Sequence, residues 1–472
     1  MSVRVKLNEL NKKQKANITK CLYLQPKQTG HFNKGFGQTP KDPVLFYNLD
    51  KPNGEIVLPY TFGNSLLGRH VNSSKNYPFS KYDMLAEPRD YQNELLAESF
   101  KHLQEKGTTT LNLRPGWGKS FAAAYLASKL NGLVLVMFPS LIIKKGWIST
   151  FKQFTNAEVW VIDSKAEVPK SCNVILSMDT MFHKIPQNIL DQVQTLVIDE
   201  AHMFCVPSRI NCLLGVQPKY VMALTATLER RDDMHRIIHA VCGKHGVSAK
   251  FEDPFTVYKF QTGIKTEIEE TKSGNPNWAK LVKDLAFDPK RNALIIDWIE
   301  HNPHFKIMVL TWNFEHAHFL KDILVSKGIS SDVLAGKKTS YRDCRVLVGT
   351  VSKCGVGMDQ ESLCDDWAGE RSNMLLIVGS TRSPSLIQQM CGRVFRAKFP
   401  IIVDFVDNNS ICKNHWRIRE QWYNDPDMSC TVLYLMLKDN KIVEGGKNSV
   451  EAEEFEQIEK RTDVIRQFLE GK

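Results

Sequence analysis

The sequence predicts an α/β protein with two lobes, each built around a parallel sheet. Short runs rich in Val, Ile and Leu, without polar alternation, are typical of strands buried on both faces. Seven such runs cover residues 133–138, 195–198, 220–224, 306–310, 345–348, 374–378 and 401–403. Helical stretches between them indicate crossover connections. A break over about residues 241–300 divides the runs into two sets, and this break predicts the two lobes.

Composition narrows the class of protein. The chain has 472 residues, of which 42% are hydrophobic and 24% charged, so a collagen-like or wholly disordered chain is excluded. It lacks an uninterrupted apolar run of about 18 residues and an apolar segment near Met1, so we expect a soluble intracellular protein without a membrane span. Eleven cysteines lie between Cys21 and Cys430 without a Cys-x-x-Cys pair, which favours buried thiols over a structural metal.

Positive charge is concentrated at the N-terminus. The whole chain carries a net charge of +10, and residues 1–40 hold eight basic side chains against the single acid Glu9, which gives +7 (8 − 1). A polyanion partner explains this excess, because contacts to phosphates release counterions. A solvated, partly disordered arm explains it equally well.

These patterns predict five segments along the chain. They are a basic N-terminal module with some β structure (1–85), the first lobe (86–247), a linker with connecting helices (248–300), the second lobe (301–440) and a C-terminal amphipathic helix (441–472). In the last segment, Phe455, Ile458, Ile465 and Phe468 share one helical face. We expect this helix to pack on the second lobe.

A candidate phosphate-binding loop, Leu113-Arg-Pro-Gly-Trp-Gly-Lys-Ser120, follows a short apolar strand and opens a helix. It matches the pattern G-x-x-x-x-G-K-[ST] except that Leu113 replaces the first glycine. Small residues such as Gly116 and Gly118 allow backbone N–H groups to surround phosphates at a helix N-terminus. Lys119 would then meet the β- and γ-phosphate charge, and the Ser120 hydroxyl would meet Mg²⁺.

Two acids stand directly after the buried run 195–198. Ligands collect at the carboxyl ends of strands in α/β sheets, so Asp199 suits Mg²⁺ and Glu200 suits polarising an attacking water. A helix N-terminus could also carry two acids. That interpretation does not explain a phosphate loop 80 positions earlier (199 − 119).

Together with these motifs, Asp199-Glu-Ala-His202, Thr225-Ala-Thr227 and Gln389-Met-Cys-Gly-Arg-Val-Phe-Arg396 resemble the superfamily 2 DExH-box (DEAH) helicases over about residues 88–407. The chain is most similar to the XPB-type branch, because Glu87-Pro-Arg-Asp-Tyr-Gln92 matches its entry motif and 227–233 its charged segment. The compact layout also resembles helicases of large cytoplasmic DNA viruses, among them the poxvirus transcript-release helicase and its asfarvirus relatives.

The resemblance implies two tandem RecA-like P-loop lobes with ATP and Mg²⁺ in the cleft between them, and it assigns roles residue by residue. The nucleotide contacts implied are Gln92 and Arg89 at adenine, Gly116, Gly118, Lys119 and Ser120 at the phosphates, Asp199 with Ser120 at Mg²⁺, and Asp359 at the ribose. The catalytic group implied is Glu200 with Lys119, Asp199, Gln389, Arg393 and Arg396. An arginine facing the γ-phosphate fits phosphoryl transfer, which spreads negative charge over the γ-oxygens.

Further roles link ATP to nucleic acid. The resemblance implies that His202, Thr225 and Thr227 couple the two sites. Ser140, Ser177, Thr311, Thr350 and Ser352 are the candidate contacts to the nucleic-acid backbone. Core or loop packing is the alternative for Ser177 and Thr311. Cys354 and Cys391 lie inside motifs, and we expect them to be buried fillers.

The sequence is therefore interpreted as a monomeric ATP-dependent helicase or translocase that moves along DNA or RNA. The resemblance implies DNA, 3′→5′ movement, and a setting in viral transcription or replication, in the host cytoplasm or the virion, with the viral RNA polymerase or transcription machinery as a partner. Two alternatives stay open. One is a duplex-DNA translocase that remodels protein–DNA complexes without separating strands, and the other is a non-catalytic scaffold that binds nucleic acid.

Overall fold

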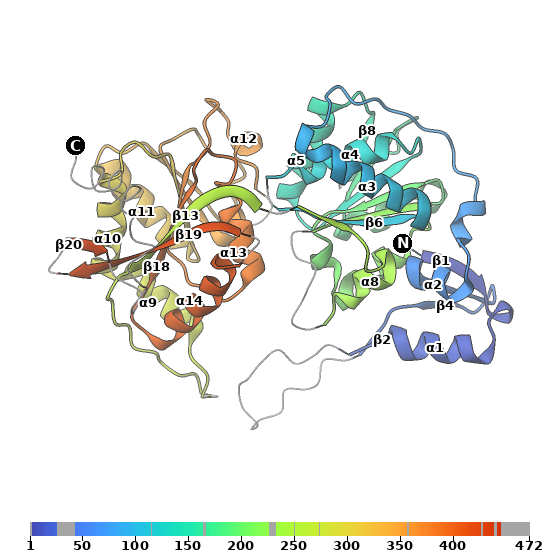
Figure 1. Cartoon of the computed structure of the whole chain (residues 1–472), viewed down its shortest axis with the longest axis horizontal. Coiled ribbons are helices and arrows are strands. Elements are labelled where there is room, and N and C mark those ends of the chain that lie inside the picture. The colour runs from blue at the N-terminus through green and yellow to red at the C-terminus, as the bar shows by residue number, and fades with distance from the viewer. Residues whose placement is uncertain are drawn as a thin grey trace. The chain divides into compact units, whose positions relative to one another are not determined.

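The computed structural model describes residues 2–25, 43–114, 116–163, 167–225, 233–249, 251–272, 274–355, 358–425, 428–438 and 441–444. The chain divides into two compact units, Met1–Ala249 and Lys250–Lys472, and each unit is described by itself (Figure 1). Within these described ranges, none of the helices combines the length and apolar character needed to cross a membrane.

The first unit contains a parallel sheet of seven strands. Their order is β12-β6-β11-β10-β7-β9-β8. The strands are β6 (Thr108–Asn112), β7 (Val134–Phe138), β8 (Val159–Val161), β9 (Val174–Met178), β10 (Thr195–Ile198), β11 (Tyr220–Thr225) and β12 (Val247–Ser248). Every pairing between them is parallel. The expected apolar runs of the first lobe therefore form neighbouring central strands.

Helices cover both faces of this sheet (Figure 1). One face, with Val134 and Val136 pointing into its core, is covered by α3 (Asp90–Lys106), α4 (Lys119–Ser128) and α5 (Leu141–Phe154). The other, with Leu135 and Met137, packs against α6 (Gln187–Leu190), α7 (Ile210–Leu214) and α8 (Arg236–Cys242). Short turns η3 (Asp179–Lys184), η4 (Ala201–Phe204) and η5 (Pro207–Arg209) complete the connections. Burial on both faces explains why the strands are apolar throughout.

The N-terminal segment folds onto this second face. Its elements are β1 (Ser2–Lys6), η1 (Leu7–Glu9), α1 (Lys12–Leu22), β2 (Tyr23–Leu24), β3 (Val44–Leu45), β4 (Asn48–Asp50), β5 (Glu55–Pro59), α2 (Tyr60–Leu67) and η2 (Val71–Ser74). β1, β5 and β4 form an antiparallel sheet, and β2 pairs with β3.

The structure differs from the expected boundary at residue 85. Val3 and Val5 belong to the same hydrophobic core as Leu135. The Ser2 N–H donates to the Val216 carbonyl at 2.9 Å, and the Tyr60 hydroxyl donates to the Lys219 carbonyl at 2.7 Å. The small β-containing module is present, but it is part of the first unit because its apolar face is buried there.

The second unit contains a sheet of eight strands in the order β15-β16-β14-β17-β18-β13-β19-β20. The strands are β13 (Phe251–Gln261), β14 (Ile307–Thr311), β15 (Ser331–Leu334), β16 (Val346–Thr350), β17 (Met374–Ile377), β18 (Ile401–Val406), β19 (Met428–Lys438) and β20 (Lys441–Glu444). All pairings are parallel except that of β19 with β20. Two sheets of this kind fit two tandem RecA-like lobes.

The expected linker over 248–300 is structured in a different way. It forms the long strand β13 and the helices α9 (Trp278–Phe287) and α10 (Pro289–Glu300), all within the second unit. Thr256-Val-Tyr-Lys-Phe260 lacks a continuous apolar run, although Val257 and Phe260 are fully buried. The remaining helical elements are α11 (Phe314–Ser326), the π-helical turn η6 (Val351–Gly355), α12 (Gln360–Leu363), α13 (Pro384–Cys391) and α14 (Ser410–Tyr423).

The C-terminal segment predicted as an amphipathic helix over 441–472 begins instead with β20 at 441–444. Its remaining residues, including Phe455 and Ile465, lie outside the described residues. β20 pairs antiparallel with β19, so the described part of this segment extends the sheet.

A buried ion pair supports α13, the helix that carries the start of motif VI, which is the segment Gln389–Arg396. Arg419 on α14 donates to both carboxylate oxygens of Asp404 on β18, at 2.7 and 2.8 Å, and both residues are fully buried. The Arg419 guanidinium also donates to the Thr381 carbonyl at 2.8 Å, two residues before the Ser383 cap of α13. The Tyr423 hydroxyl donates to Asp404 at 3.1 Å. The start of α13 is thus tied to α14 and β18.

Replacing Arg419→Met is expected to lower the free energy of unfolding of the second unit by about 3–5 kcal/mol, because Asp404 is left buried without its countercharge. Chemical denaturation of the purified chain measures this change. Lys327→Met is the control, since Lys327 forms an exposed pair with Glu300 at 2.8 Å, and such pairs contribute about 1 kcal/mol or less. Equal effects in the two variants would contradict the buried-pair argument.

Candidate functional site

The candidate phosphate loop lies between β6 and α4. Gly116 and Gly118 have φ of 85° and 102°, a region that side chains with a Cβ rarely adopt. Gly118 is the N-terminal cap of α4, so the first turn of that helix begins at Lys119 and Ser120. Backbone N–H groups and the helix dipole favour an anion at such a position. The geometry around the loop therefore fits a phosphate group.

Two contacts fix this loop to the rest of the first unit. Leu113, which replaces the expected first glycine, is fully buried, and its N–H donates to the Thr225 carbonyl at 3.1 Å. The Gln92 side-chain amide donates to the Trp117 carbonyl at 2.9 Å, while its oxygen accepts from the Arg89 N–H at 3.0 Å. Leu113 therefore serves as an anchor where the pattern has a flexible residue.

Gln92 is 3% exposed, and both ends of its amide are engaged within the protein. The structure gives Gln92 a role in holding the loop, and its contact with adenine stays a prediction. Arg89 and Tyr91 are exposed beside it, and Arg89 donates to the Tyr91 hydroxyl at 3.1 Å. The Tyr91 and Trp117 rings meet edge to face at 5.8 Å, so aromatic surface lies next to the loop.

Asp199 lies at the carboxyl end of β10 and is held by two hydrogen bonds. One oxygen accepts from the Trp147 indole N–H at 2.9 Å and the other from the Glu200 N–H at 2.8 Å. Burial raises the pKa of Asp199 to about 6, and the Glu200 charge acts in the same direction, while Lys119 and the indole lower it. The interaction with Lys119 brings the phosphate loop and the acidic pair into one site.

Glu200 has a strained backbone and a buried side chain. Its φ of 50° and ψ of 50° are left-handed, which costs a residue with a Cβ on the order of 1 kcal/mol. The side chain is 8% exposed, and Oε2 accepts no hydrogen bond from the described residues, although His202 Nδ1 lies 3.4 Å away. A buried carboxylate oxygen without a hydrogen-bond donor suits a ligand that donates a hydrogen bond, such as water.

The predicted coupling residues are connected in part. His202 Nδ1 lies 3.2 Å from Thr225 Oγ1, at the end of β11. Thr225 is 1% exposed, so this contact is internal to the first unit. Thr227 lies outside the described residues. A side-chain connection therefore leads from Glu200 through His202 to β11.

In the second unit, Asp359 follows the π-helical turn η6 and binds two arginines. One oxygen of Asp359 lies 2.6 Å from Arg396 Nη1 and 3.0 Å from Arg371 Nη1. Arg371 also pairs with Glu361 at 3.0 Å. Burial acts to raise the pKa of Asp359, but the two guanidinium groups outweigh it and the pKa is lowered. The predicted ribose contact of Asp359 stays a prediction, since its carboxylate is engaged here by arginine.

The remaining motif VI residues gather around the same turn. Arg393 donates to the Gln389 carbonyl at 3.0 Å and to the Met358 carbonyl. Gln389 is 5% exposed, and its Nε2 has no partner among the residues that the structure describes. Gln360 Nε2 donates to the Arg393 carbonyl at 2.8 Å. Arg371 and Arg396 contact Asp359, and Arg393 contacts the carbonyl of the residue before it. Guanidinium groups of this kind suit phosphate and sugar oxygens.

The predicted nucleic-acid contacts fall into two groups. Ser177 is fully buried and donates to the Met178 carbonyl at 3.0 Å. Thr311 is 3% exposed, and its hydroxyl lies 2.8 Å from His316 Nδ1. For these two the structure favours internal packing, because each hydroxyl already has a partner inside its own unit.

Of the other three candidates, Ser352 and Ser140 lie closer to solvent, whereas Thr350 is 4% exposed. Ser352 is exposed, and its hydroxyl lies 3.2 Å from that of Thr350, which ends β16. Ser140 is partly exposed and caps α5 without a side-chain hydrogen bond. Cys354 and Cys391 are fully buried, in agreement with their expected role as fillers.

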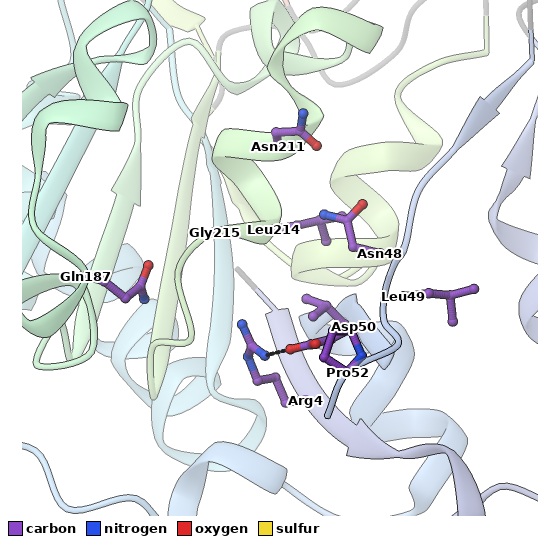
Figure 2. A pocket seen from close by; sticks show the side chains of 10 residues that line it. Arg4, Asn48, Leu49, Asp50, Pro52, Gln187, Asn211, Leu214 and Gly215 are labelled. Atoms are coloured by element: carbon purple, nitrogen blue, oxygen red, sulfur yellow. Dashed lines mark hydrogen bonds and ion pairs between the residues drawn. The ribbon is translucent and has the colours of Figure 1, made fainter. Parts of the chain in front are cut away.

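A polar pocket of about 340 Å³ lies elsewhere in the first unit, between the N-terminal segment and α6 and α7 (Figure 2). Its polar lining includes Arg4, Asn48, Asp50, Gln187 and Asn211. Arg4 already pairs with Asp50 at 2.9 Å, as the dashed line shows. This pocket contains none of the residues predicted for the nucleotide.

Comparison with known proteins agrees with this geometry. Residues 85–230 match the family described as "Type III restriction enzyme, res subunit". "Putative helicase 055L" of Frog virus 3 is 27% identical over 380 residues, covering 79% of this chain and 85% of the relative. "Putative helicase 161L" of Invertebrate iridescent virus 6 is 24% identical over 408 residues, covering 76% and 90%. These matches identify an ATP-dependent helicase.

The same matches support a superfamily 2 helicase, and a helicase of this kind uses ATP. A solved fragment of a "putative HsdR subunit" of a type I restriction enzyme from Vibrio vulnificus YJ016 shares the fold. It has a TM-score of 0.51, 16% identity, and covers 76% of this chain and 71% of its own. The helicase relatives are viral, in line with the resemblance seen in the sequence.

Three functional candidates escaped the sequence argument. Trp147 lies 52 positions from Asp199, and the spacing of the two residues does not indicate their contact. Arg371 and Gln360 lie outside the motifs matched by resemblance, and their contacts with Asp359 and Arg393 depend on tertiary structure. A pattern of residue types at fixed spacing does not reveal such partners.

Replacing Trp147→Phe is expected to lower the ATPase kcat/KM about tenfold. The change removes the N–H that orients Asp199, and a hydrogen bond to a charged group contributes roughly 1.5 kcal/mol or more. Steady-state ATPase assays measure the loss.

Phe151→Leu is the matched control for Trp147→Phe. The Phe151 ring stacks on Trp147 at a centroid distance of 5.8 Å, and this change leaves the indole N–H in place. It should lower the Tm but change kcat/KM by less than about twofold. Equal losses of kcat/KM would assign Trp147 a packing role alone.

Proposed function

We propose that this helicase is a DNA-directed motor of the XPB-type DEAH branch that moves 3′→5′ and acts in viral transcription or replication. ATP binds to the first unit at Lys119 and Ser120, and arginines of the second unit complete the site. The observation that carries the proposal is the cluster of Lys119, Asp199 and Glu200 at the carboxyl edge of the first sheet.

Each residue of this cluster has a task in the proposed reaction. Lys119 and the N–H groups at the start of α4 hold the β- and γ-phosphates. Mg²⁺, when bound by Asp199 and Ser120, would offset the phosphate charge. The unsatisfied Oε2 of Glu200 accepts a hydrogen bond from the attacking water and orients it toward the γ-phosphorus. Trp147 keeps the Asp199 carboxylate in place.

The second unit supplies positive charge to the γ-phosphate oxygens, where negative charge spreads in the transition state. Arg396 is paired with Asp359, so it must leave that carboxylate to reach the γ-phosphate. Arg371 stays with Asp359, which keeps the partly buried carboxylate compensated while Arg396 moves. Binding and release of ATP would then change the contacts of motif VI, and Arg393 and Gln389 would follow because they belong to the same turn.

Nucleic acid is the proposed track, with contacts to the backbone. Thr350 ends β16 and Ser352 follows it in the second unit, and Ser140 precedes α5 in the first. Serine and threonine hydroxyls bind phosphate oxygens without reading bases, so binding is expected to depend on salt and little on sequence. The viral relatives support a viral setting. Transcription or replication, with the viral RNA polymerase as a partner, is our proposal within that setting.

Replacing Glu200→Gln is expected to keep ATP binding and to lower kcat by about 10²–10⁴, because only the activation of water is removed. Nucleotide binding by fluorescence and turnover by phosphate release measure the two effects. Glu105→Gln is the control, since Glu105 lies on α3 and pairs only weakly with Lys101 at 4.0 Å. An unchanged kcat in Glu200→Gln would remove Glu200 from the mechanism.

Replacing Arg396→Ala is expected to lower kcat by about 10³ while changing ATP affinity much less, as for an arginine that acts on the transition state. Arg417→Ala, on the exposed side of α14, is the control and should keep the parent kcat. A loss confined to ATP affinity would argue for ground-state binding by Arg396.

The polymer and the mode of action need a separate experiment. ATPase rates with single-stranded DNA, duplex DNA, single-stranded RNA and no polymer identify the track. Strand displacement measured beside triplex displacement separates a helicase from a duplex translocase. Triplex displacement without unwinding of a tailed duplex would replace the helicase proposal by the translocase. No polymer-stimulated ATPase at all would favour the passive scaffold.

A further inference from the structure

Helix α1 carries an unusual set of charges. Its 11 residues include Lys12, Lys13, Lys15 and Lys20 and contain no acid. Lys12 and Lys13 occupy the first turn, where the helix dipole is positive and favours acids. Each cation there costs the helix a few tenths of a kcal/mol. These lysines therefore do not serve the stability of α1.

Other features stabilise this helix. Asn11 and Gln14 form a capping box, in which the Asn11 side chain accepts from the Gln14 N–H at 2.8 Å and the Gln14 side chain accepts from the Asn11 N–H at 3.0 Å. Ile18 and Leu22 are the buried residues of the helix and belong to the core of the first unit. The helix is anchored through these groups, and its lysines are not needed to hold it in place.

The four lysines are exposed to solvent. At 100° per residue, Lys13 and Lys20 project from the side of α1 opposite Ile18 and Leu22. Lys12 lies about a quarter turn from them, and Lys15 lies on the side that carries Leu22 but is exposed. Lys13 and Lys20 are separated by about 10 Å along the helix axis. In Figure 1, α1 lies on the outer side of the N-terminal segment, away from the seven-stranded sheet. The charged side of α1 is thus an open surface of the first unit.

Neighbouring cations behave differently. Arg4 pairs with Asp50 at 2.9 Å, Lys6 with Glu55 at 2.9 Å, and Arg69 with Glu9 at 2.7 Å. Asp50, Glu55 and Glu9 are therefore engaged by these three side chains.

In contrast, none of the four α1 lysines forms an ion pair with a carboxylate among the residues that the structure describes. The α1 surface, defined as Lys12, Lys13, Lys15 and Lys20, keeps its full charge. A surface of this kind is complementary to a row of phosphates.

We propose that the α1 surface is an accessory binding site for the phosphodiester backbone of nucleic acid, separate from the motor motifs. Lysine ammonium groups on flexible stems bind phosphate as point charges and do not read bases. The site would hold the nucleic acid while the motor contacts change during ATP turnover. The inference rests on the proposed function in one respect, namely that nucleic acid is the partner.

The test uses a full-length variant in which Lys12→Gln, Lys13→Gln, Lys15→Gln and Lys20→Gln are combined. Glutamine has a helix propensity close to that of lysine, so α1 should remain folded. Binding to fluorescent duplex and single-stranded DNA is measured by anisotropy from 50 to 200 mM salt. The slope of log Kobs against log salt should become shallower by about 0.9 per lost duplex contact and about 0.7 per lost single-strand contact.

The matched control removes four lysines that pair with carboxylates, namely Lys101→Gln, Lys280→Gln, Lys321→Gln and Lys327→Gln. It changes the net charge by the same amount. Its slope should stay near that of the parent protein. A second variant, with arginine at the four α1 positions, should keep the parent slope because it keeps the charge. A smaller variant, Lys13→Gln with Lys20→Gln, should lose up to about 1.8 of the duplex slope.

Equal slopes for the parent and both α1 glutamine variants would overturn the inference, and so would an equal loss in the control variant. Either result leaves the proposed function intact if DNA still stimulates the ATPase. The ATPase rate without polymer should be the same in all variants, since the α1 surface lies outside the ATP site. Failure of the parent protein itself to bind any nucleic acid would overturn the proposed function as well.

Discussion

The buried carboxylate of Asp199 is the group on which the site of the first unit depends. It ends a strand that is apolar on both faces, and a charge in such a place is stable only when it is compensated. The Trp147 indole, the Glu200 N–H and the nearby Lys119 provide that compensation. Holding these groups together brings α5, β10 and the candidate phosphate loop into one arrangement, so the geometry of the proposed ATP site follows from the need to satisfy one acid.

Much of the fold could be predicted because parallel strands buried on both faces leave a continuous apolar signal, as in 134–138 and 374–377. β13 gave no such signal, since Tyr258 and Lys259 interrupt its apolar residues, and the segment was interpreted as a linker. The N-terminal segment was expected to be separate because its Gly and Pro residues hide the fact that Val3 and Val5 complete another core. The sequence pattern indicates local secondary structure, but it does not show which surfaces pack against each other.

The candidate site likewise has some features that a local sequence pattern predicts and others that depend on tertiary contacts. The positions of Lys119 at a helix start and of Asp199 and Glu200 after a strand could be predicted from the sequence, and their roles at phosphate stay a proposal. The internal hydrogen bonds of Ser177 and Thr311, and the engagement of Asp359 by arginine, depend on partners distant in sequence. Gln92 is instructive, because its amide supports the loop itself. A residue type suited to a ligand is equally suited to a backbone carbonyl.

The buried cysteines of the second unit have a practical consequence. Cys354 and Cys391 have no solvent-exposed surface, and burial raises the pKa of both thiols. Alkylating reagents attack the thiolate, so they spare both sulfur atoms while the unit is closed. Covalent labelling at these two positions would therefore proceed only through transient opening of the fold. The labelling rate, followed by mass spectrometry, therefore measures how often the structure opens around Cys354 and Cys391.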